Sequence, residues 1–314
     1  MSTAPTIRVR VTARTDAADG IILLDLERPG GALSNWSPGA HIDLVLPDGR
    51  ERQYSLCSRP GEPTWRIGVL REHEASAWIH ENAIEGAVLE VRGPNNHFMF
   101  APTAGRRNIF VAGGIGVTAI LPMVRSAAAA GGEFTLLYVG RSRRTMAFVD
   151  ELESAFPGHV EVFAADEGRR LDVNESLGAP TERTVVYACG PARLLEALEE
   201  RMSHWPRGSL HLERFEAKVL GDPVWAEPFE VDLMLSGLSV EVAPGTSILE
   251  AVEAEGIVVP SSCRVGTCGT CEVAVVDGDV EHRDSVLSPE EQEDNRTMMI
   301  CVSRAACPRI MLEL

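Results

Sequence analysis

The chain has no long hydrophobic run: none of its apolar stretches reaches the roughly 18 residues that a membrane helix needs. Its first ten residues also lack the apolar core of a signal peptide. Positive charge is scarce, with 29 Lys and Arg against 46 Asp and Glu and a net charge of −17. These absences argue against a membrane span, export, and binding to nucleic acid or to an anionic membrane. We therefore expect a cytoplasmic enzyme.

The deficit of positive charge is greatest near the C-terminal end. Between Val224 and Leu314 there are 17 acidic and 5 basic residues, a net charge of −12. A face of this kind suits docking on a basic protein surface, and it would equally serve solubility alone. The uneven charge is therefore compatible with a protein partner.

A length of 314 residues predicts two or three domains. Residues 1–104 hold short apolar runs separated by Pro-Gly, Pro-Asp-Gly and Gly-Pro turns, which predicts an antiparallel β-barrel with a helix over 76–82. Residues 105–222 alternate apolar strands with helices, which predicts an α/β domain with a parallel sheet. A linker over 218–227 leads into residues 228–314, which hold a cysteine-rich loop. We expect a multidomain protein of α/β plus β class.

Seven cysteines occur, and four of them share the spacing of plant-type [2Fe–2S] ferredoxins, C-x4-C-x2-C with a distant fourth. These four are Cys263, Cys268, Cys271 and Cys301. A [2Fe–2S] core needs four thiolates, and Gly266 and Gly269 let the loop wrap it because glycine tolerates positive φ. The alternatives are zinc or free buried cysteines, but structural zinc sites commonly use two short pairs. Cys307 is expected to be a packed small residue.

A hexamer on a predicted barrel strand has residue types that can hold a flavin. It consists of Arg52, Gln53, Tyr54, Ser55, Leu56 and Cys57. The Arg can pin a phosphate with its planar fork. The Tyr faces the same side and can lie against an aromatic ring, while the Ser can bond a ring nitrogen. On its residues alone, the hexamer could also be part of an ordinary strand.

A Gly-rich turn follows the first strand of the expected α/β domain and precedes a helix. It consists of Gly113, Gly114, Ile115, Gly116, Val117 and Thr118. The turn is not a full G-x-G-x-x-G, but its glycines let the backbone approach a pyrophosphate at a helix N-terminus. A second turn, Cys189-Gly190-Pro191, follows a later buried strand. The alternatives are ordinary tight turns and, for Cys189, a buried small residue.

Two arginines, Arg141 and Arg143, follow the second strand of the same domain. An adenosine ribose is expected there, so these side chains could grip a 2′-phosphate. They could equally contact the pyrophosphate or face solvent. The sequence therefore leaves the choice between NADH and NADPH open at this point.

Together these motifs resemble the phthalate dioxygenase reductase family, a branch of the ferredoxin–NADP reductase superfamily. The resemblance rests on 52–57, on 113–118 with 189–191, and on the run 262–272, and it covers nearly the whole chain. It implies an FMN-binding β-barrel, an NAD-binding α/β domain and a C-terminal β-grasp ferredoxin domain. FAD is less favoured than FMN, and NADH is favoured over NADPH.

The resemblance also implies roles for single residues. Arg52 would meet the flavin phosphate, Tyr54 would pack on the isoalloxazine, and Ser55 would contact it near N5. Cys189 would lie beside the position of hydride transfer, and Phe215 would cover the flavin unless it is a core residue. Flavin contacts from the following strand and helix are implied for Gly68, Val69, Leu70, Ser76, Ala77 and Trp78.

The implied function is an NADH-dependent reductase that passes electrons through FMN and the cluster to a partner protein. In this family the partner is usually the terminal oxygenase of an aromatic-ring dioxygenase or O-demethylase system, a Rieske non-haem iron oxygenase. A cytochrome P450 is the main alternative. A stand-alone flavin or ferric reductase and a cluster-only carrier are the competing hypotheses. We expect a monomer.

Overall fold

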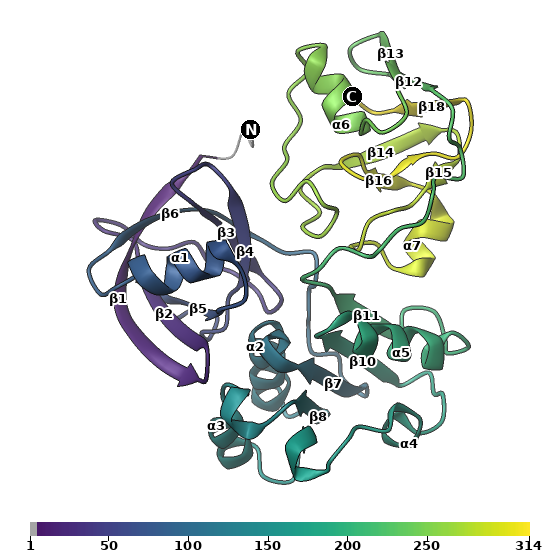
Figure 1. Cartoon of the computed structure of the whole chain (residues 1–314). Coiled ribbons are helices and arrows are strands. Elements are labelled where there is room, and N and C mark those ends of the chain that lie inside the picture. The colour runs from purple at the N-terminus through teal and green to yellow at the C-terminus, as the bar shows by residue number, and fades with distance from the viewer. Residues whose placement is uncertain (1–4) are drawn as a thin grey trace. The chain divides into compact units, whose positions relative to one another are not determined.

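The computed structural model describes residues 5–314, which form two compact units (Figure 1). Residues 5–215 make one unit, which contains both an antiparallel and a parallel sheet. Residues 216–314 make the other. Among the described residues, no helix combines the length and the apolar character that crossing a membrane requires.

The antiparallel sheet of the first unit has six strands in the order β4-β3-β6-β1-β2-β5. A bridge between Leu56 and Ile67 joins the two ends of this order, so the sheet curls into a barrel. The helix expected over 76–82 begins two residues earlier, where His73 and Ser76 form a capping box. The elements are β1 (Ile7–Ala18), β2 (Ile21–Glu27), β3 (His41–Val45), β4 (Glu51–Ser55), β5 (Trp65–Leu70), α1 (Glu74–Asn82) and β6 (Val88–Asn95).

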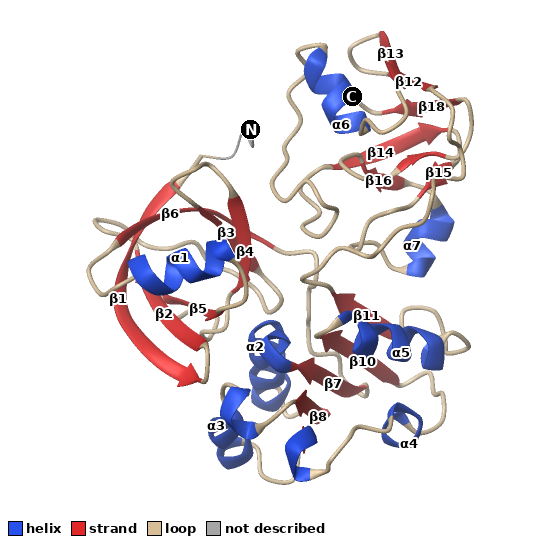
Figure 2. Ribbon diagram, viewed as in Figure 1, coloured by secondary structure: helices blue, strands red, loops and turns tan. Residues whose placement is uncertain are grey.

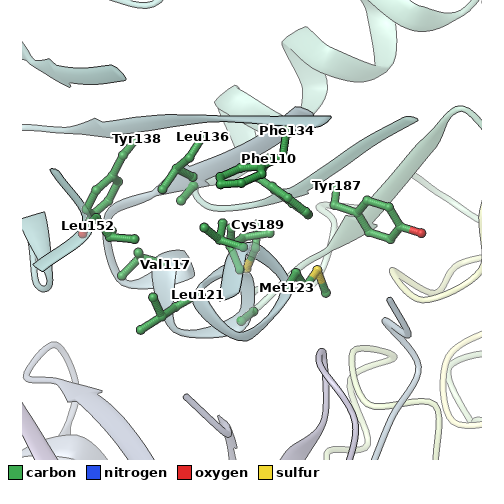
Figure 3. Packing of buried hydrophobic residues seen from close by; sticks show 14 of the residues in the cluster. Phe110, Val117, Leu121, Met123, Phe134, Leu136, Tyr138, Leu152, Tyr187 and Cys189 are labelled. Carbon is green, nitrogen blue, oxygen red and sulfur yellow. The ribbon is translucent and has the colours of Figure 1, made fainter. Parts of the chain in front are cut away.

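The parallel sheet has five strands in the order β11-β10-β7-β8-β9. Its strands are β7 (Arg107–Gly113), β8 (Glu133–Gly140), β9 (Val160–Ala164), β10 (Thr184–Cys189) and β11 (Leu210–Glu213), and its helices are α2 (Val117–Ala129), α3 (Val149–Ala155), α4 (Val173–Leu177) and α5 (Ala192–Met202). Helix α2 covers one face: Figure 3 shows Val117 and Leu121 of α2 beneath Leu136 and Phe110 of the sheet. Strands β7 and β10 lie side by side at the centre, so their carboxyl ends present the two expected nucleotide turns together.

The second unit has a mixed sheet in the order β13-β12-β18-β14-β16 (Figure 2). Strands β15 and β17 form a separate pair. Strands β12 and β18 are parallel, and helix α6 packs beside β13. The elements are β12 (Phe229–Leu233), β13 (Leu238–Val242), α6 (Ile248–Ala254), β14 (Glu272–Asp277), β15 (Val280–Glu281), α7 (Pro289–Asp294), β16 (Thr297–Met299), β17 (Arg304–Ala305) and β18 (Arg309–Leu312). The expected fold class is confirmed: a flavin-type barrel, a parallel α/β sheet and a ferredoxin-type β domain.

The segment expected to be a linker is fastened to the second unit. The Lys218 amide donates to the Ser285 hydroxyl at 3.1 Å, and Arg283 donates to the Gly221 carbonyl at 2.7 Å. The Val224 amide donates to a carboxylate of β15 at 2.9 Å. By these contacts residues 216–222 belong with the ferredoxin-type unit, whereas the sequence analysis grouped them with the α/β domain.

Candidate electron-transfer sites

The four motif cysteines gather as two pairs in the second unit. The Cys268 thiol hydrogen-bonds Cys263, and the Cys301 thiol hydrogen-bonds Cys271. The first of these bonds is the largest cause that lowers the pKa of the Cys263 thiol below its ordinary value. Among residues 5–314, no three His, Cys, Asp or Glu side chains are placed to hold a single metal ion. Two pairs of thiols fit a [2Fe–2S] cluster, because each of its two irons takes two thiolates.

The loop that carries three of these cysteines has the backbone needed to wrap a cluster. Arg264, Gly266 and Gly269 all have positive φ, at 56°, 73° and 74°. A Cβ on Gly266 would lie 2.5 Å from Cγ2 of Val302, so only glycine fits. The Cys263 sulfur accepts N–H groups from the loop itself, including that of Thr267 at 3.4 Å. The residues present therefore fit a [2Fe–2S] cluster, and Cys307 packs against the core as expected.

The flavin hexamer covers most of β4 and the two residues that follow it, in agreement with the strand predicted there. Arg52 is exposed and donates to the Glu51 carbonyl at 2.7 Å, which leaves the rest of its guanidinium available. Tyr54 packs against the barrel core, and burial raises the pKa of its hydroxyl to about 12. Gln53 is held by Asp43 through a 2.6 Å hydrogen bond. Their contacts with a flavin stay a prediction.

Ser55, at the end of β4, meets a carboxyl group that the sequence analysis missed. It is buried and hydrogen-bonds Glu213 of β11. The Glu213 Oε2 atom is buried without a hydrogen-bond partner, and burial raises the pKa of this carboxyl to about 8. Cys189 is the partner of Glu213 in the β10–β11 register, and burial raises its thiol pKa too. Three groups from distant parts of the chain thus converge where the barrel meets the parallel sheet.

The two glycine turns of the α/β sheet pack directly on each other. A Cβ on Gly116 would lie 2.3 Å from the Cys189 carbonyl oxygen, and one on Gly113 would lie 2.6 Å from Pro191. On the barrel side, a Cβ on Gly68 would lie 2.7 Å from Cγ2 of Thr118. Only residues without a side chain allow these approaches. The barrel strand β5, the Gly113–Thr118 turn and the Cys189 turn therefore border one region.

The first turn of α1 is less open to a phosphate than expected. The Ser76 hydroxyl accepts the His73 amide at 3.0 Å, and the Ala77 amide donates to the His73 carbonyl at 2.8 Å. Trp78 packs against the barrel core. Because the capping turn already uses the hydroxyl and one amide, their role as phosphate ligands stays a prediction.

The structure places Phe215 outside the cores. It is 44% exposed and lies two residues after Glu213, the last residue of β11. This position disfavours the alternative of a core phenylalanine. Its role as the aromatic cover of the flavin stays a prediction.

Comparison with known proteins shows the family to which the chain belongs. Residues 232–306 match the family model of the 2Fe-2S iron-sulfur cluster binding domain. The chain is 42% identical to the phenoxybenzoate dioxygenase subunit beta of Ectopseudomonas oleovorans, with all of both chains covered. It is similar to the solved structure of phthalate dioxygenase reductase, with 33% identity, a TM-score of 0.69 and 98% of each chain covered. The chain belongs to the phthalate dioxygenase reductase family.

This family membership confirms an oxidoreductase of the flavin and iron–sulfur type that uses NADH, FMN and a [2Fe–2S] cluster. The reductase is also similar to an intact type IV self-sufficient cytochrome P450 monooxygenase, with 42% identity and a TM-score of 0.90. It covers 41% of that longer chain, and 98% of the reductase is matched. Solved structures similar to this chain therefore include one of about its own length and one that is part of a longer enzyme.

The arginines of the reductase's nucleotide domain are not equally available. The Arg143 guanidinium donates two 2.9 Å hydrogen bonds to the Glu153 carboxylate. Its Nε donates a third, of 3.1 Å, to Glu167. Arg141 is exposed, and its carbonyl accepts the Asp166 amide at 3.0 Å. An arginine neutralised by two carboxylates is poorly placed to receive a 2′-phosphate. This geometry fits NADH.

Proposed function

We propose that this reductase takes hydride from NADH where the barrel meets the parallel sheet and delivers single electrons through Cys263–Cys301 to a terminal oxygenase. The observation that carries the proposal is the convergence of Ser55, Cys189 and Glu213 beside the two glycine turns. When bound, FMN accepts the hydride and passes electrons one at a time to the cluster.

The residues of the chain position these groups rather than react themselves. The glycine turns let a pyrophosphate approach the N-terminal end of α2. Arg52 is free to fix the flavin phosphate, and Tyr54 is held by the barrel core to support the ring. Because its pKa is about 8, Glu213 is neutral at pH 7, so it can share a hydrogen bond with Ser55 without placing a negative charge there.

The partner we propose is the oxygenase of an aromatic-ring dioxygenase or O-demethylase system. The full-length similarity to a dioxygenase subunit supports this choice. We propose that the partner docks on the acidic ferredoxin-type unit, where α7 alone carries four acidic residues, and that the reductase is a monomer. The similarity to a fused P450 supports a P450 as the second candidate.

The electron route is tested by visible spectra of the purified protein before and after anaerobic NADH. We expect the flavin absorbance to bleach and the cluster absorbance to fall with it. A protein without flavin absorbance would refute the route. A stand-alone flavin reductase would instead reduce ferric chelates equally well when the cluster is absent.

The partner is tested by stopped-flow electron transfer to a purified Rieske oxygenase and to a P450, each at low and high salt. We expect faster transfer to the Rieske protein, and a rate that falls with salt because charge attraction guides docking. Faster transfer to the P450 would favour the second candidate. Light scattering in solution tests the monomer.

A further inference from the structure

A cavity of about 320 Å³ lies in the ferredoxin-type unit beside the cluster ligand Cys301. Three arginines line it, although this unit is the most acidic part of the chain. They are Arg264, Arg283 and Arg304. The protein does not neutralise these three positive charges equally.

Two of the three arginines have carboxylate partners. Arg264 holds both oxygens of Glu253, at 2.5 and 3.1 Å. Arg283 is paired with Glu281. Glu250 also lines the cavity. Its Oε2 accepts hydrogen bonds from the amide and the hydroxyl of Ser247, each at 2.9 Å.

The third guanidinium, that of Arg304, has no such partner. It is 7% exposed, its Nη1 donates to the Thr246 carbonyl at 2.7 Å, and it lies 5.0 Å from the centre of the Phe229 ring. Its buried Nε has no hydrogen-bond partner. Within residues 5–314, no carboxylate lies within ion-pair distance of this side chain. A guanidinium stays charged in proteins, so Arg304 is a buried cation with no carboxylate in direct contact; Glu281 acts on it only from a greater distance.

The carboxylate best placed to neutralise Arg304 is committed elsewhere. Glu281 is the direct partner of Arg304 in the β15–β17 register. However, its Oε1 is bound to Arg283 and its Oε2 accepts the Val224 amide at 2.9 Å. A buried charge is costly unless something opposite in sign offsets it. The structure therefore leaves a positive charge three residues after Cys301, on the wall of the same cavity.

A [2Fe–2S] cluster held by the four cysteines would supply the missing negative charge. Two ferric ions, two sulfides and four thiolates leave two net negative charges, and one added electron leaves three. A fixed cation nearby favours the form with more negative charge, and no proton is needed to balance the step. We propose that Arg304 is the counter-ion of the [2Fe–2S] cluster and raises its reduction potential, which favours electron transfer from flavin to cluster. This proposal rests on the cluster assignment made above.

The proposal is tested by redox titration of the full-length holoprotein, with the reduced cluster followed by electron paramagnetic resonance. Arg304→Met should lower the cluster potential enough to shift the flavin–cluster electron distribution about tenfold, which is about 59 mV for one electron. Arg304→Lys should keep most of the wild-type value. The FMN potential, measured in the same sample, should not move.

Arg309→Met is the matched control, because it removes the same charge from an exposed side chain that Asp232 already neutralises. Equal cluster potentials in Arg304→Met and Arg309→Met would overturn the proposal. If Arg304→Met fails to hold the cluster, Arg304→Lys and Arg304→Gln give the same comparison, since one keeps the charge and the other removes it. A wild-type protein without a cluster signal would instead refute the cluster assignment itself.

Discussion

The buried carboxyl of Glu213 provides the sharpest test of the site between the barrel and the parallel sheet. Its pKa is raised from 4.5 to about 8, chiefly by burial. A shift of this size means that ionising the group costs about 5 kcal/mol more in the folded chain than in the unfolded one. Glu213→Gln keeps a neutral hydrogen-bonding side chain of nearly the same shape, so it isolates the charge.

The shift predicts how stability depends on pH. Because the folded chain holds this proton more tightly than the unfolded chain, the stabilising effect is complete below about pH 4.5. It is lost as the pH rises through about 8, by up to ~5 kcal/mol. Glu213→Gln should lack this decline. Denaturation followed by flavin fluorescence at pH 5.5 and pH 8.5 measures it.

The same ionisation should change the rate of flavin reduction. Above about pH 8 the carboxylate places a negative charge beside Ser55, which opposes the arrival of further negative charge. Stopped-flow reduction by NADH should therefore slow with an apparent pKa near 8 in the wild type and stay flat in Glu213→Gln. Glu161→Gln, at an exposed position on β9, is the control and should keep the wild-type profile. An identical inflection in wild type and Glu213→Gln would refute the reasoning.

Three further changes test the remaining sites. Cys268→Ala should abolish reduction of cytochrome c and leave NADH-to-flavin reduction intact, whereas Cys307→Ala should keep both; loss of both steps in Cys268→Ala would contradict the linear route. Glu153→Gln should remove the negative charge that holds the two Nη atoms of Arg143, while Glu167 stays on Nε, and raise kcat/KM for NADPH about tenfold, the effect of one charge-assisted hydrogen bond of ~1.5 kcal/mol; an unchanged NADPH rate would contradict it. In Gly116→Ala the new Cβ would lie 2.3 Å from a backbone carbonyl oxygen. This variant should have a roughly tenfold higher KM for NADH at unchanged flavin content. A normal KM would show that the turn relaxes to accommodate the methyl group.

The features that could be predicted from the sequence are those whose chemistry is local. The cysteine loop fixes its ligands by spacing, and its glycines are required by positive φ within the same loop. Gly116 likewise marks a tight turn that any strand-to-helix nucleotide loop needs. Short helices such as α4 and α7 were not predicted, because five or six residues give too little periodicity to recognise.

The features that could not be predicted depend on contacts between distant segments. Glu213 looks like one more acidic residue, and only the approach of Ser55 from the barrel shows that it is buried and neutral. The one available signal was an acidic residue at the end of an apolar strand. The sequence also could not show that Arg143 is neutralised, because Glu153 and Glu167 come from two other segments.

Glu213 and Arg304 address the same physical problem at two different centres. Each centre gains negative charge when it is reduced, and negative charge is costly in a buried site. At the first centre the chain keeps a nearby carboxyl protonated; at the second, in our proposal, it leaves a guanidinium without a carboxylate in direct contact. Only the first device depends on pH, because a guanidinium does not lose its proton. Raising the pH above 8 should therefore slow the entry of electrons at the flavin while leaving the potential of the cluster unchanged.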